Sequence, residues 1–124
     1  MVNLNNLKEL KNYIEQNHGA TLTPTLDNAT HNNGFYVSLK DFETKTRLSR
    51  LDIRTIKHYQ EKAQKYGAYI GAWIDNGVLY LDISKHVKSK RKALKLARKN
   101  YQLAIYDIKK GKSVYIHWKN HKLR

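Results

Sequence analysis

The fold is decided by the stretch Gly67–Ser84, which reads GAYIGAWIDNGVLYLDIS. Two runs of alternating residues flank the dipeptide Asn76-Gly77, the strongest short-range signal of a β-hairpin with a two-residue turn. This turn sets the register, so Ile74 is expected opposite Leu79 and apolar side chains line one face. The sequence therefore predicts an antiparallel hairpin that buries one face and has a second, aromatic face.

Helical patterns precede and follow this hairpin. Before it, apolar residues recur every three or four positions and predict a helix from about residue 50 to 66. Ser49 and Asp52 have the spacing of a capping box, and Gly67 suits the end of the helix. After the hairpin, a helix is expected from about Ser89 to Tyr101. Its narrow apolar stripe consists of Ala93, Leu94, Ala97 and Tyr101.

Shorter patterns complete the expected element order. Leucine and isoleucine at helical spacing predict a helix before Gly19, and residues 20–34 are expected to form a polar connector. Period-two alternation predicts a strand beginning at Phe35 and a final hairpin with strands at 101–108 and 113–118. The order is helix, strand, helix, strand, strand, helix, strand, strand.

Four of these strands and the two later helices fit a β-α-β-β-α-β arrangement, the ferredoxin-like split unit. The expected fold class is therefore α+β, an antiparallel sheet with an added N-terminal helix and C-terminal strand. A chain of 124 residues has the size of one domain. We expect a single basic domain over residues 1–124, with the N-terminal helix and connector in 1–34 and the core in 35–124.

The charge of the chain is strongly unbalanced. Twenty-four Lys and Arg face ten Asp and Glu, which gives a formal net charge of +14. Residues 1–62 hold nine basic and seven acidic side chains, whereas residues 63–124 hold fifteen and three. Such an imbalance favours a polyanionic partner, and nucleic acid, either RNA or DNA, is the partner that we expect.

The sharpest charged feature is the helix that follows the hairpin. Between Ile83 and Tyr106 there are eight Lys or Arg and no Asp or Glu. A solvated helix normally interleaves the two signs to gain pairs four residues apart, and this helix gives up that stabilisation. Phosphates would relieve the repulsion and release counterions, although the alternative is a charged surface that touches nothing specific. The candidate nucleic-acid-binding residues are Lys85, Lys88, Lys90, Arg91, Lys92, Lys95, Arg98, Lys99, Lys109, Lys110 and Lys112.

The sheet face opposite the helices is expected to carry aromatic side chains. Aromatic rings in basic surroundings stack unpaired bases, and each stacked base contributes about 1–3 kcal/mol. The segment 76–83 is distantly similar to the RNA-recognition motif family, with Gly77 and Tyr80 in place. In that family, aromatic residues stand where this chain has Val78 and Ile83. The rings expected on this face are Tyr36, Tyr69, Trp73, Tyr80 and Tyr106, and the alternative is that the N-terminal helix covers them.

Enzymatic and metal-binding patterns are weak in this chain. Without cysteine there is no thiolate nucleophile, disulfide or sulfur-ligated metal site. A His-Asn-His nuclease needs a strand-strand-helix spacing that the C-terminal histidines lack, and one aspartate near a lysine is too little for an acid-acid-lysine nuclease. The residues concerned are His117, Asn120 and His121 for the first pattern and Asp75, Asp82, Lys85 and Asp107 for the second. We therefore predict a binding protein, with no catalytic residues, no metal site and no cofactor, and a metal-dependent nuclease is the third alternative.

The sequence also bears on location. The longest apolar run is Ala68–Ile74, which is far shorter than a membrane span. The segment from Met1 to Ala20 lacks the apolar stretch of a signal peptide. We therefore expect a cytoplasmic protein with no membrane partner, and the sequence carries no signal for its oligomeric state.

A family resemblance rests on the hairpin Gly67–Ser84, on Asn100 and on the segment Gln102–Asp107. Over roughly the C-terminal half, the chain resembles small, largely uncharacterised proteins encoded by bacteriophages and other mobile elements of bacteria. The resemblance implies a bacterial host cell and an accessory protein that acts on nucleic acid, or an inhibitor of host defence machinery such as CRISPR nucleases and restriction enzymes. A net charge of +14 argues against DNA mimicry, so such an inhibitor would contact RNA, DNA or an acidic protein face.

Overall fold

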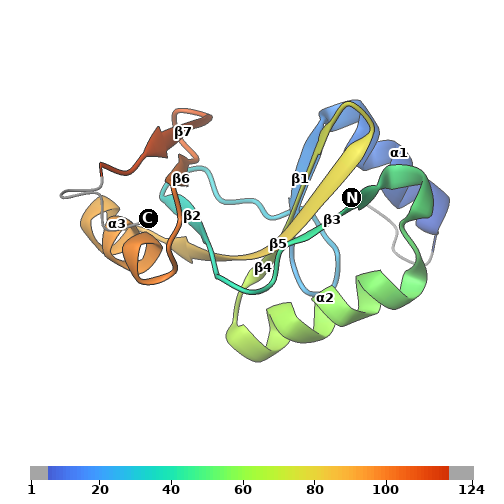
Figure 1. The fold of residues 1–124 in the computed structure, drawn as a ribbon, viewed down its shortest axis with the longest axis horizontal. Helices are drawn as coiled ribbons and strands as arrows, with labels where there is room; N and C mark the ends of the chain where they lie inside the picture. The colour runs from blue at the N-terminus through green and yellow to red at the C-terminus, as the bar shows by residue number, and fades with distance from the viewer. Residues whose placement is uncertain (1–5, 118–124) are drawn as a thin grey trace. The chain divides into compact units, whose positions relative to one another are not determined.

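The computed structural model describes residues 6–117, in which it forms three α-helices and an antiparallel sheet (Figure 1). The predicted α+β class is confirmed. No helix in this part of the chain is long and apolar enough to cross a membrane. Contacts divide the chain into two compact units, and the expectation of a single domain stays a prediction. Unit 1 comprises Met1–Thr30 and Asp41–Ser84, and unit 2 comprises His31–Lys40 and Lys85–Arg124.

Unit 1 combines two helices with strands β1, β4, β5 and β3. Strand β4 lies between β1 and β5, and β3 pairs with β5. The elements are α1 (Leu7–Asn17), β1 (Gly19–Leu22), β3 (Thr44–Arg47), a short 3-10 turn η1 (Leu48–Arg50), α2 (Ile53–Tyr66), β4 (Tyr69–Asp75) and β5 (Val78–Val87). Strand β5 continues into unit 2 after Ser84.

The hairpin of β4 and β5 has the predicted register. Ile74 pairs with Leu79, so the apolar residues of both strands fall on one face. At the turn, Asn76 and Gly77 have φ values of 52° and 77°. Two successive positive φ values are the type I′ geometry, whose twist matches that of the strands it joins.

The first helix packs on the apolar face of this hairpin. Leu10 and Ile14 of α1 are buried, and they line a small internal cavity together with Ile70 and Leu81. Trp73 is three residues from Ile70 along β4, so the two side chains point to opposite faces of the sheet. The Trp73 side chain is on the face away from the core, and 49% of its surface is exposed. The alternative in which the N-terminal helix covers the aromatic rings of this hairpin is therefore wrong.

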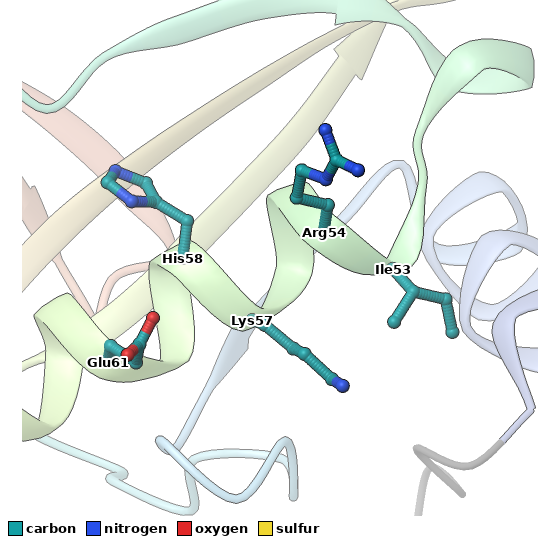
Figure 2. A pocket seen from close by; sticks show the side chains of 5 residues that line it. All are labelled: Ile53, Arg54, Lys57, His58 and Glu61. Carbon is teal, nitrogen blue, oxygen red and sulfur yellow. The ribbon is translucent and has the colours of Figure 1, made fainter.

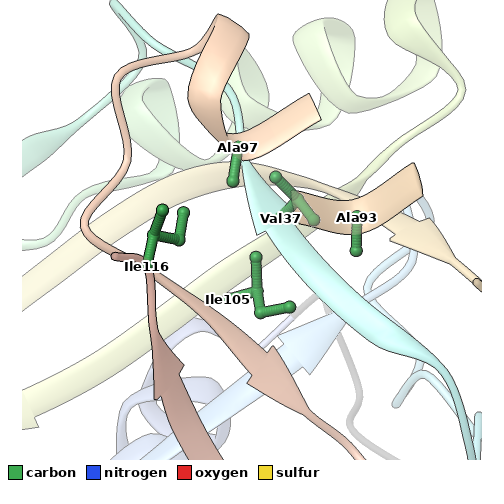
Figure 3. Close-up of a cluster of buried hydrophobic side chains, with 5 residues drawn as sticks. All are labelled: Val37, Ala93, Ala97, Ile105 and Ile116. Carbon is green, nitrogen blue, oxygen red and sulfur yellow. The ribbon is translucent and has the colours of Figure 1, made fainter. Parts of the chain in front are cut away.

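Unit 2 packs one helix on a small sheet. Its elements are β2 (Phe35–Ser38), the end of β5 (Lys85–Val87), α3 (Lys90–Lys99), β6 (Ala104–Asp107) and β7 (Lys112–Tyr115). Buried apolar side chains from the helix and the strands point toward one another (Figure 3). They are Val37, Ala93, Ala97, Ile105 and Ile116. Because α3 contributes alanines, its backbone can lie close to the sheet.

The strand order β1-β4-β5-β2-β6-β7 contains the expected split unit. In it, β2 and β4, which flank α2 in sequence, are separated by β5, and β5 and β6, which flank α3, are separated by β2. Each helix thus connects two strands that are not neighbours, as a split β-α-β unit requires. The predicted β-α-β-β-α-β core is confirmed, with a helix before it and β7 after it.

Two strands of unit 1 are missing from the sequence prediction. Strand β1 occupies the start of the segment 20–34, which was expected to be a connector without strands. Strand β3 lies before α2 and was not expected. The side chains of β3 alternate between half-buried threonines and exposed cations, and β1 has one buried side chain, Leu22, so neither strand carries the run of apolar residues that would mark it in the sequence. They form because the hairpin offers partners, with Gly19 opposite Trp73 and Lys45 opposite Tyr80.

Helix α2 begins later than the capping box suggested. Asp52 is its N-cap, and the Asp52 carboxylate accepts the backbone N–H of Thr55 at 2.8 Å. Ser49 lies in the preceding 3-10 turn instead. Both residues are N-cap types, and the carboxylate is favoured because it also carries a negative charge at the positive end of the helix dipole.

Helix α3 ends at Lys99, two residues before the predicted end. The side chain of Asn100 donates to the Leu96 carbonyl at 2.9 Å and accepts the backbone N–H of Lys40 at 3.0 Å. Tyr101 then takes a left-handed conformation with φ of 56°. It is 62% exposed, so its assignment to the apolar stripe of the helix was wrong.

Replacing Tyr101 with glycine is expected to raise the free energy of unfolding by about 1 kcal/mol, because glycine adopts a positive φ without the steric cost that a side chain imposes. Little burial is lost, since the ring is largely exposed and its described contact is with Lys40, whose Nζ lies 5.3 Å from the ring centroid. Urea unfolding followed by circular dichroism measures the change. Tyr101→Ala keeps the Cβ and is the control; equal stabilisation by alanine would contradict the explanation.

Candidate nucleic-acid interface

The net charge of the chain belongs to unit 2. Counted over the sequence, unit 1 has nine basic and nine acidic side chains, so its formal charge is zero. Unit 2 has fifteen basic side chains and one acidic side chain, and it carries the whole charge of +14. The charge counts for residues 1–62 and 63–124 do not coincide with the charges of the two units. Lys40 belongs to unit 2, whereas Asp75 and Asp82 belong to unit 1.

All eleven predicted binding residues lie in unit 2, and ten of them are exposed. Lys85, at the end of β5, is half-buried. The exposed ones form two groups that we call the α3 basic surface and the basic turn. The α3 basic surface consists of Lys88, Lys90, Arg91, Lys92, Lys95, Arg98 and Lys99, and the basic turn consists of Lys109, Lys110 and Lys112.

The α3 basic surface is held by a helix whose buried side is narrow. Ala93 and Ala97 are fully buried in unit 2, Leu94 and Leu96 pack partly buried against the same core, and the cations occupy the exposed surface of the helix. Ser89 caps the helix, since its hydroxyl oxygen accepts the backbone N–H of Lys92 at 3.3 Å. The first turn contains basic residues and no acidic one, which places cations at the positive end of the helix dipole. An anion bound there would relieve both sources of repulsion.

The basic turn between β6 and β7 is organised by Asp107, the one carboxylate in the described residues of unit 2. Its side chain is buried and accepts the backbone N–H of Lys110 at 3.2 Å. Its carbonyl accepts the N–H of Gly111 at 2.8 Å, and Gly111 has φ of 64°. Asp107 therefore stabilises the turn through its side chain and its carbonyl, while the lysine side chains are exposed to solvent.

The predicted aromatic face is divided between the two units. Tyr36 and Tyr106 belong to unit 2, where their rings are nearly parallel with centroids 6.5 Å apart. Tyr69, Trp73 and Tyr80 belong to unit 1. There the rings of Trp73 and Tyr80 stack at 4.3 Å, and a lysine from β3 places its Nζ 5.7 Å from the Tyr80 ring.

Two histidines that the sequence did not indicate join the rings of unit 2. The His31 and His86 rings stack with centroids 3.6 Å apart, and His31 Nδ1 hydrogen-bonds the Tyr36 hydroxyl at 2.9 Å. Burial lowers the pKa of His31, and the neighbouring His86 lowers it further. Extending the period-two pattern of β5 to its true end at Val87 would have placed His86 on the same face as Tyr80. His31 lies in an irregular segment and carries no such signal.

The residues of the acid-acid-lysine pattern belong to both units, Asp75 and Asp82 to unit 1 and Lys85 and Asp107 to unit 2. Asp82 accepts a hydrogen bond from Ser84 at 2.8 Å, and Asp75 is exposed at the end of β4. His117 is exposed, whereas Asn120 and His121 lie outside the described residues. Within residues 6–117, no group of three or more His, Asp or Glu side chains is placed to hold a metal ion.

Unit 1 has an open hollow along the outer side of α2 (Figure 2). The side chains that line it all come from this one helix: Ile53, Arg54, Lys57, His58 and Glu61. They carry both signs of charge, and they spread apart rather than converge on a common point. The hollow therefore lacks the convergent polar groups of a ligand site.

The fold and the charge distribution together define an α+β protein with a neutral unit and a basic unit. No protein-family model, curated protein or solved structure matches the chain.

Proposed function

We propose that this protein binds nucleic acid through unit 2, with the α3 basic surface and the basic turn contacting phosphates. The observation that carries the proposal is the placement of the entire net charge of +14 in unit 2, against one buried carboxylate in its described residues. A surface that only kept the chain dissolved would not need such segregation, and it would be stabilised by interleaved signs.

The physical basis of binding is counterion release. Exposed lysine and arginine side chains replace the cations that surround a nucleic-acid backbone, and the released cations gain entropy. The ten exposed cations come from a helix and a turn that are each fixed by capping interactions, so the backbone of the binding surface is ordered before the strand arrives. The chemistry needs no cofactor.

The biological role that fits this chemistry is that of a non-enzymatic accessory protein of a bacteriophage or mobile element, acting in the cytoplasm of its bacterial host. An inhibitor of a host defence ribonucleoprotein or nuclease would use the same basic surface. Capture from host lysate with and without nuclease treatment separates the two roles. A partner lost on nuclease treatment supports nucleic-acid binding, and a protein partner that survives it supports the inhibitor.

The direct test is binding of fluorescent single- and double-stranded DNA and RNA over a salt series from about 50 to 400 mM. We expect the logarithm of affinity to fall linearly with the logarithm of salt concentration. Four to six phosphate contacts give a slope of about −3 to −5. Absence of binding to every probe at low salt, or affinity that does not change with salt, would overturn the proposal.

A further inference from the structure

Four aromatic rings of unit 2 lie in contact with one another and are called the ring cluster: His31, Tyr36, His86 and Tyr106. Tyr36 and Tyr106 are a cross-strand pair of β2 and β6. Their neighbours Val37 and Ile105 are buried in the core beneath α3. Because successive side chains of a strand point to opposite faces, the two tyrosines stand on the sheet face that α3 leaves uncovered.

The inner part of the ring cluster is rigidly held. The His86 Nε2 donates to the carbonyl of Asn33 at 2.9 Å, and the His86 ring stacks on that of His31. His31 is hydrogen-bonded to the Tyr36 hydroxyl, and the Tyr36 ring meets the His86 ring edge-on with centroids 5.9 Å apart. The orientation of Tyr36 is therefore fixed before any ligand binds.

The outer ring of the cluster is accessible. Tyr106 is 42% exposed, and its cross-strand neighbour on β7 is the small, exposed Ser113. Tyr115, two residues further on β7, projects to the same side of the sheet and is 78% exposed. A cluster with a purely structural role would be expected to bury its rings, whereas this one ends in a row of tyrosines that reaches solvent.

The exposed charges in the described residues of unit 2 are of one sign. Asp107 is the one described carboxylate of the unit. It points to the same face of β6 as the buried Ile105 and is itself buried. Lys109 and Lys110 lie in the basic turn, one residue beyond β6, and Lys88 follows the end of β5. The Tyr106 hydroxyl lies beside this turn, 3.8 Å from the position that a Cβ on Gly111 would take. Exposed rings bordered by cations match the two parts of an unpaired nucleotide, a base to stack and a phosphate to neutralise.

We infer that the ring cluster is a stacking surface for unpaired bases, so the nucleic acid that unit 2 binds is single-stranded. The inference rests on the proposed function and adds its substrate class. In a duplex the base faces are stacked inside the helix and cannot lie on a protein ring. Phosphate contacts alone would favour the duplex, whose charge density is higher, so a preference for single strands comes from the rings.

The decisive variant is Tyr106→Leu, which removes the ring and keeps an apolar side chain. Loss of one stacked base is expected to weaken single-strand binding by about 5- to 100-fold. Tyr106→Phe keeps the ring and should bind within about 2-fold of the original protein, since stacking needs no hydroxyl. Tyr101→Leu, an exposed tyrosine of unit 2 outside the cluster, is the matched control and should leave binding unchanged.

Oligonucleotides that lack a base at chosen positions test the same contact by a change in the nucleic acid instead of the protein. Such a strand should bind the original protein as weakly as the intact strand binds Tyr106→Leu, and Tyr106→Leu should not distinguish the two strands. Equal affinity of the original protein for duplex and single strand, or unchanged single-strand binding by Tyr106→Leu, would overturn the inference while the proposed function stood. Failure of the original protein to bind any nucleic acid would instead overturn the proposed function.

Discussion

Reversing four charges of the α3 basic surface is expected to lower the affinity for nucleic acid by about 1,000-fold at physiological salt. The variant replaces Lys88, Lys92, Lys95 and Lys99 with glutamate. Each lost phosphate contact reduces the salt slope by about 1, so a flatter salt dependence should accompany the weaker binding. The fold should survive, because all four side chains are exposed. Glutamate at position 92 also faces the positive end of the helix dipole.

The matched control reverses the same number of charges in unit 1. Lys8, Arg50, Lys57 and Lys65 are exposed, and their replacement by glutamate changes the net charge of the chain by the same amount. Binding by this control should fall by less than about 10-fold, through long-range attraction alone. Circular dichroism confirms that both variants fold. An equal loss of binding in the two variants would show that the interface is not confined to unit 2.

What the sequence predicts well is local. The Asn76-Gly77 dipeptide specifies its own turn geometry, so the hairpin and its register follow from a few adjacent residues. Helix α3 is likewise predicted by the N-cap residue Ser89 and by apolar residues at helical spacing. The split β-α-β-β-α-β order follows from these elements in turn, since a helix between two strands has few ways to return to the same sheet.

What the sequence does not show is which distant segments meet. Strand β1 forms because Gly19 finds a partner in Trp73, more than fifty residues away, and its own residues carry no strand pattern. Unit 2 is discontinuous, so no single cut of the chain reveals that its charge is +14 and that of unit 1 is zero. For the same reason, the five predicted rings divide between the two units.

The histidines illustrate a further limit. His86 extends the outward-facing row of β5, yet its significance depends on His31, which reaches it from a segment without regular structure. Their stack requires Gly34, whose φ of 87° brings the segment back against β5. The sequence shows an ordinary glycine in a polar loop. Its role becomes apparent only from the close packing around it.

Replacing Gly34 with alanine is accordingly expected to lower the free energy of unfolding by about 2–4 kcal/mol. A positive φ with a Cβ costs about 1 kcal/mol. The new Cβ would also stand 2.6 Å from His86 Nε2 and 3.1 Å from the Val87 carbonyl oxygen, and such overpacking adds about 1–3 kcal/mol. The His86 ring cannot move away freely, because it is stacked on His31 and bonded to Asn33. Urea unfolding measures the loss.

Two controls separate the cost of the positive φ from the cost of the contact between the new Cβ and the His86 ring. Gly111, in the same unit, has φ of 64°, and its Cβ would meet its nearest neighbour, the Tyr106 hydroxyl, at an ordinary 3.8 Å. Gly111→Ala should therefore lose only about 1 kcal/mol. In a His86→Ala background, Gly34→Ala should cost less than in the original protein, because the ring that it strikes is gone and only the backbone strain and the close approach to the Val87 carbonyl remain. If Gly34→Ala costs the same with and without the His86 ring, the ring cluster is not the rigid support that base stacking on Tyr106 requires.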